Sequence, residues 1–449
     1  MFVSPRPKSG TFWAAVFKRD NHSRHHDPSQ FGQEGAQEQN SRQGKTSQGG
    51  VVRFLEETFR PLKAREEEVS ASPVIDPDAP YHDFKFDVHF RLREVVVIAL
   101  RNAILNILTL TLYRFWARTR VRRYMWSRTT LFGDPLEYVG SGIEIFSGFI
   151  FIVVVLVVPL VGTSMSLKLF VSPDSPIAAV YAAVLYLGIF YLYGVARYRA
   201  RRYRLSRTLW RGIRFGLKGS WVRYGLRTLV LAYLTGFSLF IVYPIQRFVL
   251  MKDIMSHTTI GDRQLHFAGS ASKLYPSFAF AWIFSIIGIV ALIAAIAEGF
   301  SAVQAAGLLP FEMNMDELGK ATASPKTVLI IGLATLIFYR LVGLVLAVTL
   351  AWYRAAEMRY FADCTRLDGV QYHFQASGLA VLWLGVGNSL LLLFTLGMAL
   401  PLAQMRTFKF FFQRLTAEGK IDIDSIGQGD SPYPYVGEGL AEYFEIGSV

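Results

Sequence analysis

Cysteine is almost absent from this sequence, because Cys364 is the only one in 449 residues. A single thiol cannot form an intrachain disulfide, and it cannot supply a thiolate-rich metal site. The sequence also lacks a glycine-rich phosphate loop, a His-Glu-x-x-His pair and a nucleophile elbow. Its apolar segments carry no paired nucleophile and base of the kind that an intramembrane hydrolase needs. We therefore predict no catalytic residue, no metal ion and no cofactor, and hence a protein that is not an enzyme.

Charged residues are scarce as well. They make up 18% of the chain, whereas 52% is hydrophobic and the mean hydropathy is +0.30. These values are high for a soluble globular protein and ordinary for a polytopic membrane protein. The apolar residues gather in four long blocks without a polar face, at 146–162, 177–196, 278–297 and 327–353. Each block can cross the hydrocarbon layer of a bilayer, roughly 30 Å thick, as a helix of about 20 residues.

The two ends of the chain differ from this apolar middle. Residues 1–80 are rich in Gln, Ser, Gly, His and Arg, a composition that cannot bury enough apolar surface, so we predict a disordered tail. The N-terminus has no apolar core with a small-residue cleavage site, so we expect no cleaved signal peptide. The alternating segment 84–90 predicts a short strand near the start of a membrane domain over 82–420. We expect residues 421–449 to form an acidic, loosely ordered tail.

One sequence unit occurs four times beside the apolar blocks. It joins basic and aromatic residues to threonine, a glycine turn and an alternating apolar segment, with copies at 120–142, 199–220, 247–270 and 354–378. Recurrence at such spacing indicates an internal repeat. We interpret each copy as a short β-hairpin in which a glycine supplies a positive φ between two strands. The four turn glycines are Gly133, Gly212, Gly261 and Gly369.

The basic stretches predict the orientation of the chain in the membrane. Residues 114–128 contain six arginines and no acidic residue, and residues 197–227 contain eleven Arg and Lys, again without an acid. Basic loops stay on the cytoplasmic side. We therefore predict that both stretches, the β-hairpins and the N-terminus are cytoplasmic.

Three further apolar segments are less uniform, at 95–116, 226–247 and 386–406. Each has a Thr- or Gly-containing break near its middle, and in a gapless match of the first and third segments Asn102 aligns with Asn388. Basic residues flank all three on both sides, so a full crossing would put one basic flank outside. Each segment is therefore either an ordinary span with imperfect charge bias or a re-entrant helix that returns to the cytoplasmic side. The predicted fold is an all-α polytopic membrane protein with four clean transmembrane helices, three such segments and short cytoplasmic β-hairpins.

Polar residues within the apolar segments are the first candidate site. Arg340 has about a dozen apolar residues on each side, and a charge at that depth usually faces a partner or a wet cavity. Glu298, at the end of the preceding span, is one candidate partner. Asn102, Asn106 and Asn388 are the other candidates. These residues either form structural contacts between helices or line the pathway of a solute.

The arginines of the repeated unit are the second candidate site. They are Arg118, Arg120, Arg122, Arg123, Arg199, Arg201, Arg202 and Arg204. Either they are topological anchors beside docking hairpins, or they form a surface for anions and lipid headgroups, since arginine with tyrosine and tryptophan suits phosphate and interfacial contacts. Cytoplasmic basic loops explain the positive charge without nucleic acid, so we expect no nucleic-acid partner.

The sequence resembles the YjgN-like family of bacterial inner-membrane proteins, a domain of unknown function. The resemblance is carried by residues 106–142, 360–374 and 388–406, within a likeness that covers about 82–449. Thr111 departs from the family, which more often has glycine there. The resemblance implies a multipass protein of the bacterial inner membrane and supplies no activity.

Two functions fit these observations. The first is a channel or transporter for a small solute, an anion being one candidate, because broken, polar-bearing apolar segments in internal repeat are a recurring transporter feature. The second is a non-transporting membrane scaffold or anionic-lipid-binding protein, based on the aromatic and basic cytoplasmic face. The lipid bilayer is the expected partner in both cases, and the sequence does not indicate an oligomeric state.

Overall fold

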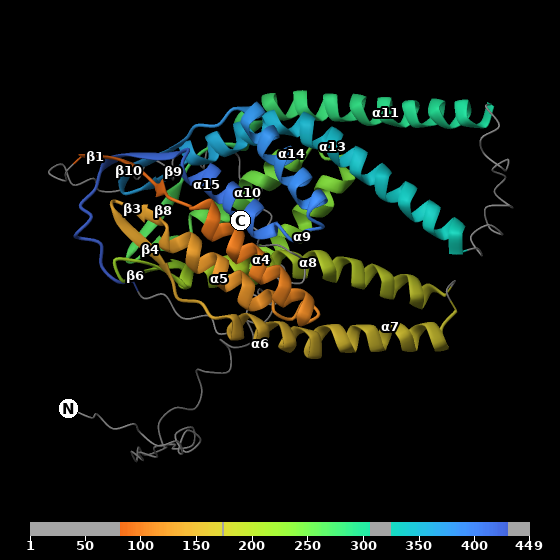
Figure 1. Cartoon of the computed structure of the whole chain (residues 1–449), viewed down its shortest axis with the longest axis horizontal. Coiled ribbons are helices and arrows are strands. Elements are labelled where there is room, and N and C mark those ends of the chain that lie inside the picture. Colours follow the sequence, from red (N-terminus) through yellow and green to blue (C-terminus); the bar gives the residue numbers. More distant parts are fainter. Residues whose placement is uncertain (1–80, 173–174, 306–324, 430–449) are drawn as a thin grey trace, which may run out of the picture. The chain divides into compact units, whose positions relative to one another are not determined.

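The structure is a computed structural model that describes residues 81–429, apart from 173–174 and 306–324. The predicted disorder of residues 1–80 lies outside the described residues, as does the tail beyond residue 429. The described residues belong to one compact unit. They are mostly helical, with an antiparallel sheet of short strands at one end of the helices (Figure 1).

The strands form one sheet that closes on itself. β1 and β2 stand at the two ends of the strand order, yet in the chain they are separated by Phe86 alone. Every neighbouring pair is antiparallel, and from β3 to β11 each strand pairs with the next strand in the chain. The strands are β1 (Tyr81–Lys85), β2 (Asp87–Val88), β3 (Thr129–Leu131), β4 (Asp134–Tyr138), β5 (Thr208–Trp210), β6 (Ile213–Leu217), β7 (Thr258–Ile260), β8 (Arg263–Phe267), β9 (Thr365–Leu367), β10 (Gly369–Phe374) and β11 (Leu415–Lys420).

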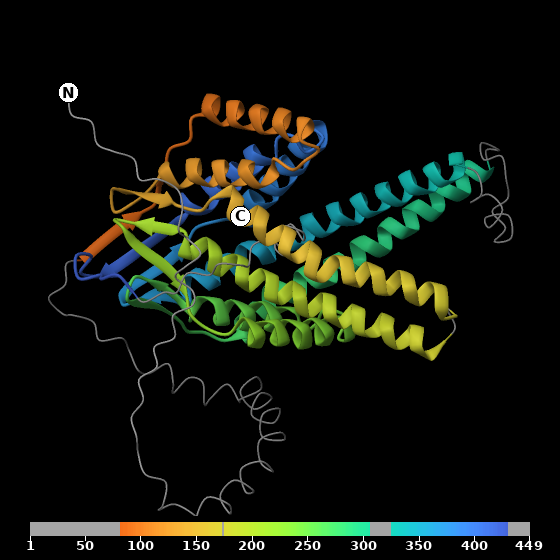
Figure 2. The ribbon, with the colours of Figure 1, turned by 90° about the horizontal axis from the view of Figure 1, so that it is seen from below.

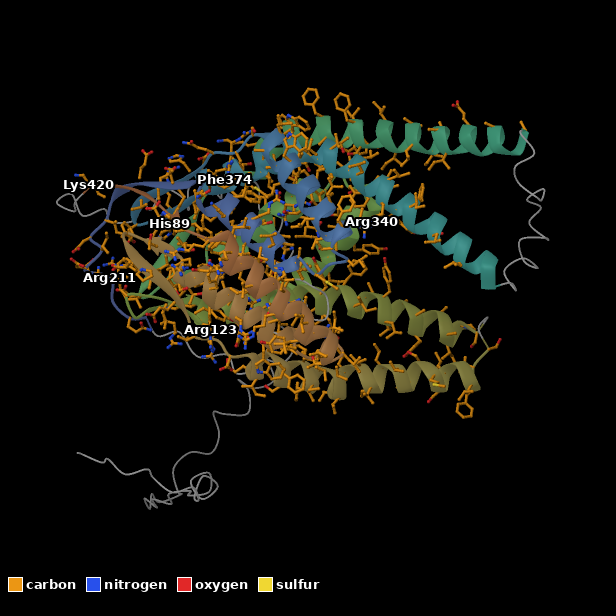
Figure 3. All side chains as sticks on the ribbon, viewed as in Figure 1. His89, Arg123, Arg211, Arg340, Phe374 and Lys420 are labelled. Carbon is orange, nitrogen blue, oxygen red and sulfur yellow. The ribbon has the colours of Figure 1, made fainter. Side chains whose placement is uncertain are left out.

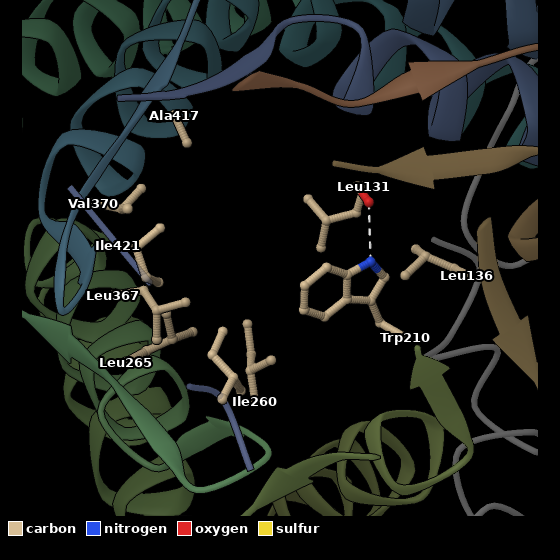
Figure 4. Packing of buried hydrophobic residues seen from close by; sticks show 10 residues of the cluster. Leu131, Leu136, Trp210, Ile260, Leu265, Leu367, Val370, Ala417 and Ile421 are labelled. Atoms are coloured by element: carbon tan, nitrogen blue, oxygen red, sulfur yellow. Dashed lines mark hydrogen bonds between the residues drawn. The ribbon is translucent and has the colours of Figure 1, made fainter. Parts of the chain in front are cut away.

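Apolar side chains from these strands fill the closed sheet. Figure 4 shows them pointing inward from strands that lie far apart in the sequence. Trp210 is 1% exposed, and its indole Nε1 donates a hydrogen bond to the carbonyl oxygen of Leu131 at 3.0 Å. Ile421 and Ile426 belong to the same core. The first residues of the predicted acidic tail, 421–429, therefore pack against the sheet.

Five helical hairpins connect the strands of the described part. Each one leaves the sheet from one strand and returns to the strand paired with it, so both ends of every hairpin lie on the same side. Three hairpins are short: α4 (Leu92–Leu108) with α5 (Arg114–Ser127), α9 (Trp221–Phe237) with α10 (Tyr243–Met255), and α14 (Gly378–Phe394) with α15 (Leu400–Phe412). Two are long: α6 (Gly142–Ile152), the π-helix η2 (Val153–Val157) and α7 (Val158–Phe170) with α8 (Pro176–Ser206); and the 3₁₀-helix η3 (Ala271–Leu274) and α11 (Tyr275–Ala305) with α13 (Pro325–Asp363).

The long hairpins contain the four predicted spans. Helices over Gly142–Leu167, Pro176–Ser206, Ala271–Gly299 and Ile337–Asp363 are long and apolar enough to cross a membrane, which confirms this part of the predicted fold. In Figures 1 and 2 the long hairpins extend further from the sheet than the short ones.

The short hairpins are the three segments for which the sequence left two interpretations. None of them continues as a single helix. Each breaks at two consecutive residues with positive φ and turns back to the sheet: Leu110 (49°) with Thr111 (71°), Leu239 (49°) with Phe240 (69°), and Leu396 (49°) with Gly397 (83°). Thr111 thus adopts, at a cost in strain, the left-handed conformation that glycine takes at the equivalent position 397. The geometry favours the returning helix over the ordinary span.

The joints between helix and sheet explain the repeated sequence unit. A threonine at the start of each repeated β-hairpin donates a hydrogen bond from its side-chain hydroxyl to the carbonyl four residues earlier. This gives a partner to a carbonyl that the end of the helix leaves unpaired. The threonines are Thr129, Thr208, Thr258 and Thr365, at 2.8, 2.9, 2.8 and 2.7 Å. A serine after each β-hairpin accepts a hydrogen bond from a backbone N–H of the next helix, as an N-cap does. These serines are Ser141, Ser220, Ser270 and Ser377.

The turns agree with the prediction at three of four glycines. Gly133, Gly212 and Gly261 have positive φ values of 86°, 78° and 60°. The expectation for Gly369 is wrong: it is the first residue of β10, and the positive φ of 49° falls on Asp368. Aspartate tolerates this conformation better than most residues with a side chain, which is why the turn can shift by one position.

The folded-back hairpins predict the side on which single cysteines react. On a Cys364→Ser background, cysteines at Ser127, Ser256 and Ser377 should resist an impermeant thiol reagent added from the periplasm, because all three lie where helices meet the sheet. They should react after the membrane is permeabilised. A cysteine at Ser172, between α7 and α8, is the control that should react in intact cells. Periplasmic labelling at any of the first three positions would contradict the fold-back.

Candidate functional site

The helix ends that enter the sheet carry the predicted arginine surface. We call eight of these arginines the basic collar. They are Arg118, Arg120, Arg122 and Arg123 of α5, and Arg199, Arg201, Arg202 and Arg204 of α8. Of these eight, Arg123 is exposed, Arg122 is buried and the others are partly buried. Most arginines of the collar therefore pack partly against neighbouring helices, and only a part of their surface is accessible to solvent or lipid.

Some arginines of the collar hold a helix against the chain that follows it. Arg122 Nη1 donates to the Tyr138 hydroxyl at 3.2 Å, and Arg123 Nη2 donates to the carbonyl of Gly140 at 2.8 Å. Figure 3 labels Arg123. The repeat reproduces the second contact, since Arg359 Nη1 donates to the carbonyl of Ala376 at 2.8 Å. These arginines have a structural role, whatever else the collar binds.

Four of the ion pairs in the described residues connect one helix of a hairpin, or the residue at its end, to another helix. Two join the beginning of a hairpin to its end: Glu94 with Arg128 at 3.1 Å, and Glu144 with Arg207 at 2.9 Å. The third joins Arg227 of α9 to Asp253 of α10, and the fourth joins Arg247 Nε of α10 to Glu357 Oε1 of α13 at 2.6 Å. Burial by itself lowers the pKa of Arg247, but the neighbouring Glu357 carboxylate raises it, so the net pKa is raised and Arg247 stays charged.

Helices α8 and α9 approach each other closely because glycine faces glycine. A Cβ on Gly194 would lie 3.1 Å from the Cα of Gly225 and 2.6 Å from the Cβ of Thr228. The contact brings the rings of Tyr198 and Tyr224 to a centroid distance of 5.1 Å. A larger side chain at either glycine would push the two helices apart.

Tyr224 is a deeply buried polar group at this contact. Its side chain is 2% exposed, and its hydroxyl has no hydrogen-bond partner. Burial raises the pKa of Tyr224, and the nearby Arg197 and Arg201 lower it only in part, so the hydroxyl keeps its proton at neutral pH and can donate it to an acceptor. Arg201 Nε is also buried without a partner.

The predicted intramembrane residues are not brought together. Arg340 and Glu298 are both exposed, about 35 Å along α13 and α11 from the helix ends at the sheet. Figure 3 shows Arg340 on α13, at a distance from the sheet residues Arg211 and Lys420. In the described part of the chain no ion pair involves Arg340 or Glu298.

The three asparagines lie within the short hairpins. Asn388 Nδ2 donates to the Thr407 hydroxyl of α15 at 2.9 Å. Asn102, its counterpart on α4, is 2% exposed, and neither atom of its amide has a partner. Position 121 on α5, which the repeat aligns with Thr407, is Val121, so α5 lacks a hydroxyl like the one that accepts a hydrogen bond from Asn388. Asn106 Oδ1 is also unpartnered.

Sequence reasoning missed Tyr224, Arg197 and the four carboxylates of the ion pairs. Charge was counted within continuous basic stretches, whereas three of these acids lie on the other arm of the same helical hairpin and Glu357 lies on another hairpin. One signal was present for Tyr224: it precedes Gly225, directly before the apolar segment 226–247, and small residues mark close helix contacts in membranes.

These features define a class of protein: a mostly helical chain with four candidate membrane spans, organised around an antiparallel sheet of short strands. The chain belongs to the DUF898 family, bacterial proteins of unknown function, which matches residues 82–443. No curated protein and no solved structure matches it.

Proposed function

We propose that this protein is a non-transporting scaffold of the bacterial inner membrane that binds anionic phospholipids at the basic collar. The observation that carries the proposal is the position of the collar between the apolar spans and the sheet. Residues 177–196 of α8 are apolar, and the collar arginines follow immediately on the same helix. Arginines that directly follow an apolar span lie at the level of the lipid headgroups. Near an anionic membrane surface each contributes about 1 kcal/mol to lipid binding.

The sheet is on the cytoplasmic side in this proposal. All five hairpins of the described part return to it, so every basic helix end lies on its side of the membrane. Cytoplasmic loops carry the excess of arginine and lysine in membrane proteins. The long hairpins then cross the bilayer from the cytoplasm and return.

The short hairpins enter only the cytoplasmic leaflet. Their first helices have 17 residues, about 25 Å, and part of that length lies beside the collar. Their tips expose large apolar side chains: Leu110 is 85% exposed, Phe237 84% and Leu396 87%. Contiguous exposed apolar groups of this kind mark a membrane or protein contact. The three exposed apolar tips support the insertion of the short hairpins into one leaflet of the bilayer.

Two observations favour a scaffold over a transporter. The interior of the closed sheet is apolar, so it offers no wet route along its axis. The four candidate spans bury only 6% to 22% of their most apolar stretch within the chain, so most of their surface faces outward. Helices that line a solute path would instead face one another around it.

The experiment compares lipid retention by two matched double variants. In nanodiscs of phosphatidylglycerol and phosphatidylcholine, the purified protein should enrich phosphatidylglycerol relative to empty discs. Arg120→Gln with Arg202→Gln should weaken this enrichment about tenfold, because two headgroup-level charges are lost. Arg211→Gln with Lys420→Gln removes the same charge at the end of the sheet away from the helices (Figure 3) and should leave it unchanged.

Other outcomes would count against this function. Equal enrichment in both double variants would show that the collar is not the lipid-binding site. No enrichment in the unmodified protein would show that it does not bind anionic lipid selectively. One observation favours the transporter instead: exposed charges at the depth of Arg340 and Glu298 are costly in lipid, and a second copy of the chain could enclose them. Saturable flux of a small anion in proteoliposomes would support that alternative.

A further inference from the structure

The contact between α8 and α9 contains two polar groups that the fold leaves unsatisfied. Tyr224 is 2% exposed and its hydroxyl lacks a partner, and Arg201 Nε is buried without one. Native proteins pair nearly all buried polar atoms, and an exception calls for a bound water, ion or ligand. Since the glycine contact at Gly194 and Gly225 fixes the two helices closely, the aromatic ring of Tyr224 is held in place.

The charges around Tyr224 leave an excess of positive charge. Four elements contribute: α8 brings Arg197 and Arg201, α9 brings Arg227, α10 brings Arg247 and Asp253, and α13 brings Glu357. Both carboxylates are already engaged, Asp253 with Arg227 and Glu357 with Arg247. In the described residues no carboxylate forms an ion pair with Arg197 or Arg201. An anion that accepts hydrogen bonds would complement both the excess positive charge and the unpaired donors of this site.

The height of the site indicates where that anion comes from. Arg197 is the first charged residue after the apolar stretch 177–196 of α8, so it lies where hydrocarbon gives way to headgroups. Arg197 and Arg201 are both partly exposed, and their long side chains can move to admit a ligand between them. A phosphate offers several acceptor oxygens, which suits two guanidinium groups and one hydroxyl.

We propose that α8 and α9 bind the phosphate of an anionic phospholipid, with Arg197 and Arg201 opposing its charge and the Tyr224 hydroxyl donating a hydrogen bond to it. This inference rests on the proposed lipid-binding function and names one specific site within it. The acyl chains of the bound lipid lie along the apolar part of α8, and the headgroup lies beside the collar. Free phosphate shares the same chemistry, and the experiment separates the two sources.

The test measures binding to the full-length protein in detergent by native mass spectrometry. Phosphatidylglycerol should bind more tightly than phosphatidylcholine with the same acyl chains. Tyr224→Phe removes one oxygen atom and should weaken phosphatidylglycerol binding about tenfold or more, because a hydrogen bond to a charged group is lost. Arg201→Lys keeps the charge, loses the planar donor group and should also weaken binding.

Matched controls separate this site from general electrostatics. Tyr233→Phe makes the same change at an exposed tyrosine of α9, and Arg223→Gln removes one charge at the exposed residue next to Tyr224. Both should bind the lipid as the unmodified protein does. Because Tyr224→Phe keeps the aromatic ring, thermal unfolding should show that this variant folds normally even if the Arg201 variant does not.

The outcomes identify the ligand or reject the site. Inorganic phosphate that binds in detergent with the same dependence on Tyr224, while the lipid does not, assigns the site to free phosphate and overturns the lipid assignment. Binding of phosphatidylglycerol that is equal in Tyr224→Phe and in the unmodified protein means that the hydroxyl holds only a water, and it rejects the site while leaving the collar intact. Absence of any preference for phosphatidylglycerol in nanodiscs rejects the proposed function itself.

Discussion

Glu357→Gln is expected to lower the free energy of unfolding by about 3 kcal/mol. Glu357 is 2% exposed and pairs with Arg247 at 2.6 Å, and this ion pair joins a short hairpin to a long one. Removing one partner leaves an uncompensated buried charge, which costs roughly 3–5 kcal/mol. The low end applies because the Arg247 side chain is 25% exposed, so water reaches part of it. In detergent the melting temperature should fall by about 5 °C or more.

Two comparisons test the physical reason for that loss. Arg247→Met combined with Glu357→Leu removes both charges and should recover most of the stability, because apolar pairs of similar volume often replace buried ion pairs without loss. Asp424→Asn breaks the exposed pair between Arg211 and Asp424 and should change the free energy of unfolding by less than about 1 kcal/mol. Equal losses at Glu357 and Asp424 would show that burial does not set the cost.

The β-hairpins were predictable from sequence because their signals are local. A threonine that caps the helix, a turn residue with positive φ and a serine that caps the next helix all lie within about 15 residues of one another. The closure of the sheet was not predictable, because it depends on β11, whose short sequence LTAEGK consists mostly of residue types that are depleted in strands, namely Ala, Glu, Gly and Lys. That strand pairs with β10 on one side and with β1 on the other, across more than three hundred residues of the chain.

The turning back of the short hairpins was partly predictable. Basic residues on both sides of each segment indicated that the chain returns, and this argument follows from charge alone. The break itself gave a weaker signal, because Leu110, Leu239 and Leu396 adopt a positive φ that leucine rarely takes. Gly397 was the one residue in these turns whose type suits the conformation.

The collar was identified by composition, but its roles could not be separated that way. Arg122 and Arg201 look alike in the sequence, in adjacent repeats of the same Arg-Arg pair. In the structure the first donates to Tyr138 within its own repeat, whereas the second has a buried Nε with no partner beside Tyr224 of the next hairpin. Which arginine is structural depends on the side chain that another helix or strand places beside it, and residue type does not carry that information.

Trp210→Ala should cause the second large loss, about 3–5 kcal/mol in the free energy of unfolding. Trp210 is 1% exposed inside the closed sheet, where it packs against side chains from several hairpins and donates to the Leu131 carbonyl at 3.0 Å. Its removal leaves a cavity and an unsatisfied carbonyl at the centre of the element that joins all five helical hairpins. Thermal unfolding in detergent measures the loss.

Limited proteolysis shows which part of the structure the loss of Trp210 destabilises. In the Trp210→Ala variant, trypsin should cleave faster after Arg211, at the tip of the β5–β6 turn, because local opening of the sheet then costs less free energy. Trp383→Ala is the matched control: this tryptophan on α14 is 65% exposed, so its removal should cost less than about 1 kcal/mol and leave the cleavage rate unchanged. If both variants lost the same stability, or if Trp210→Ala left the Arg211 site protected, the closed sheet would not be what holds the helical hairpins together.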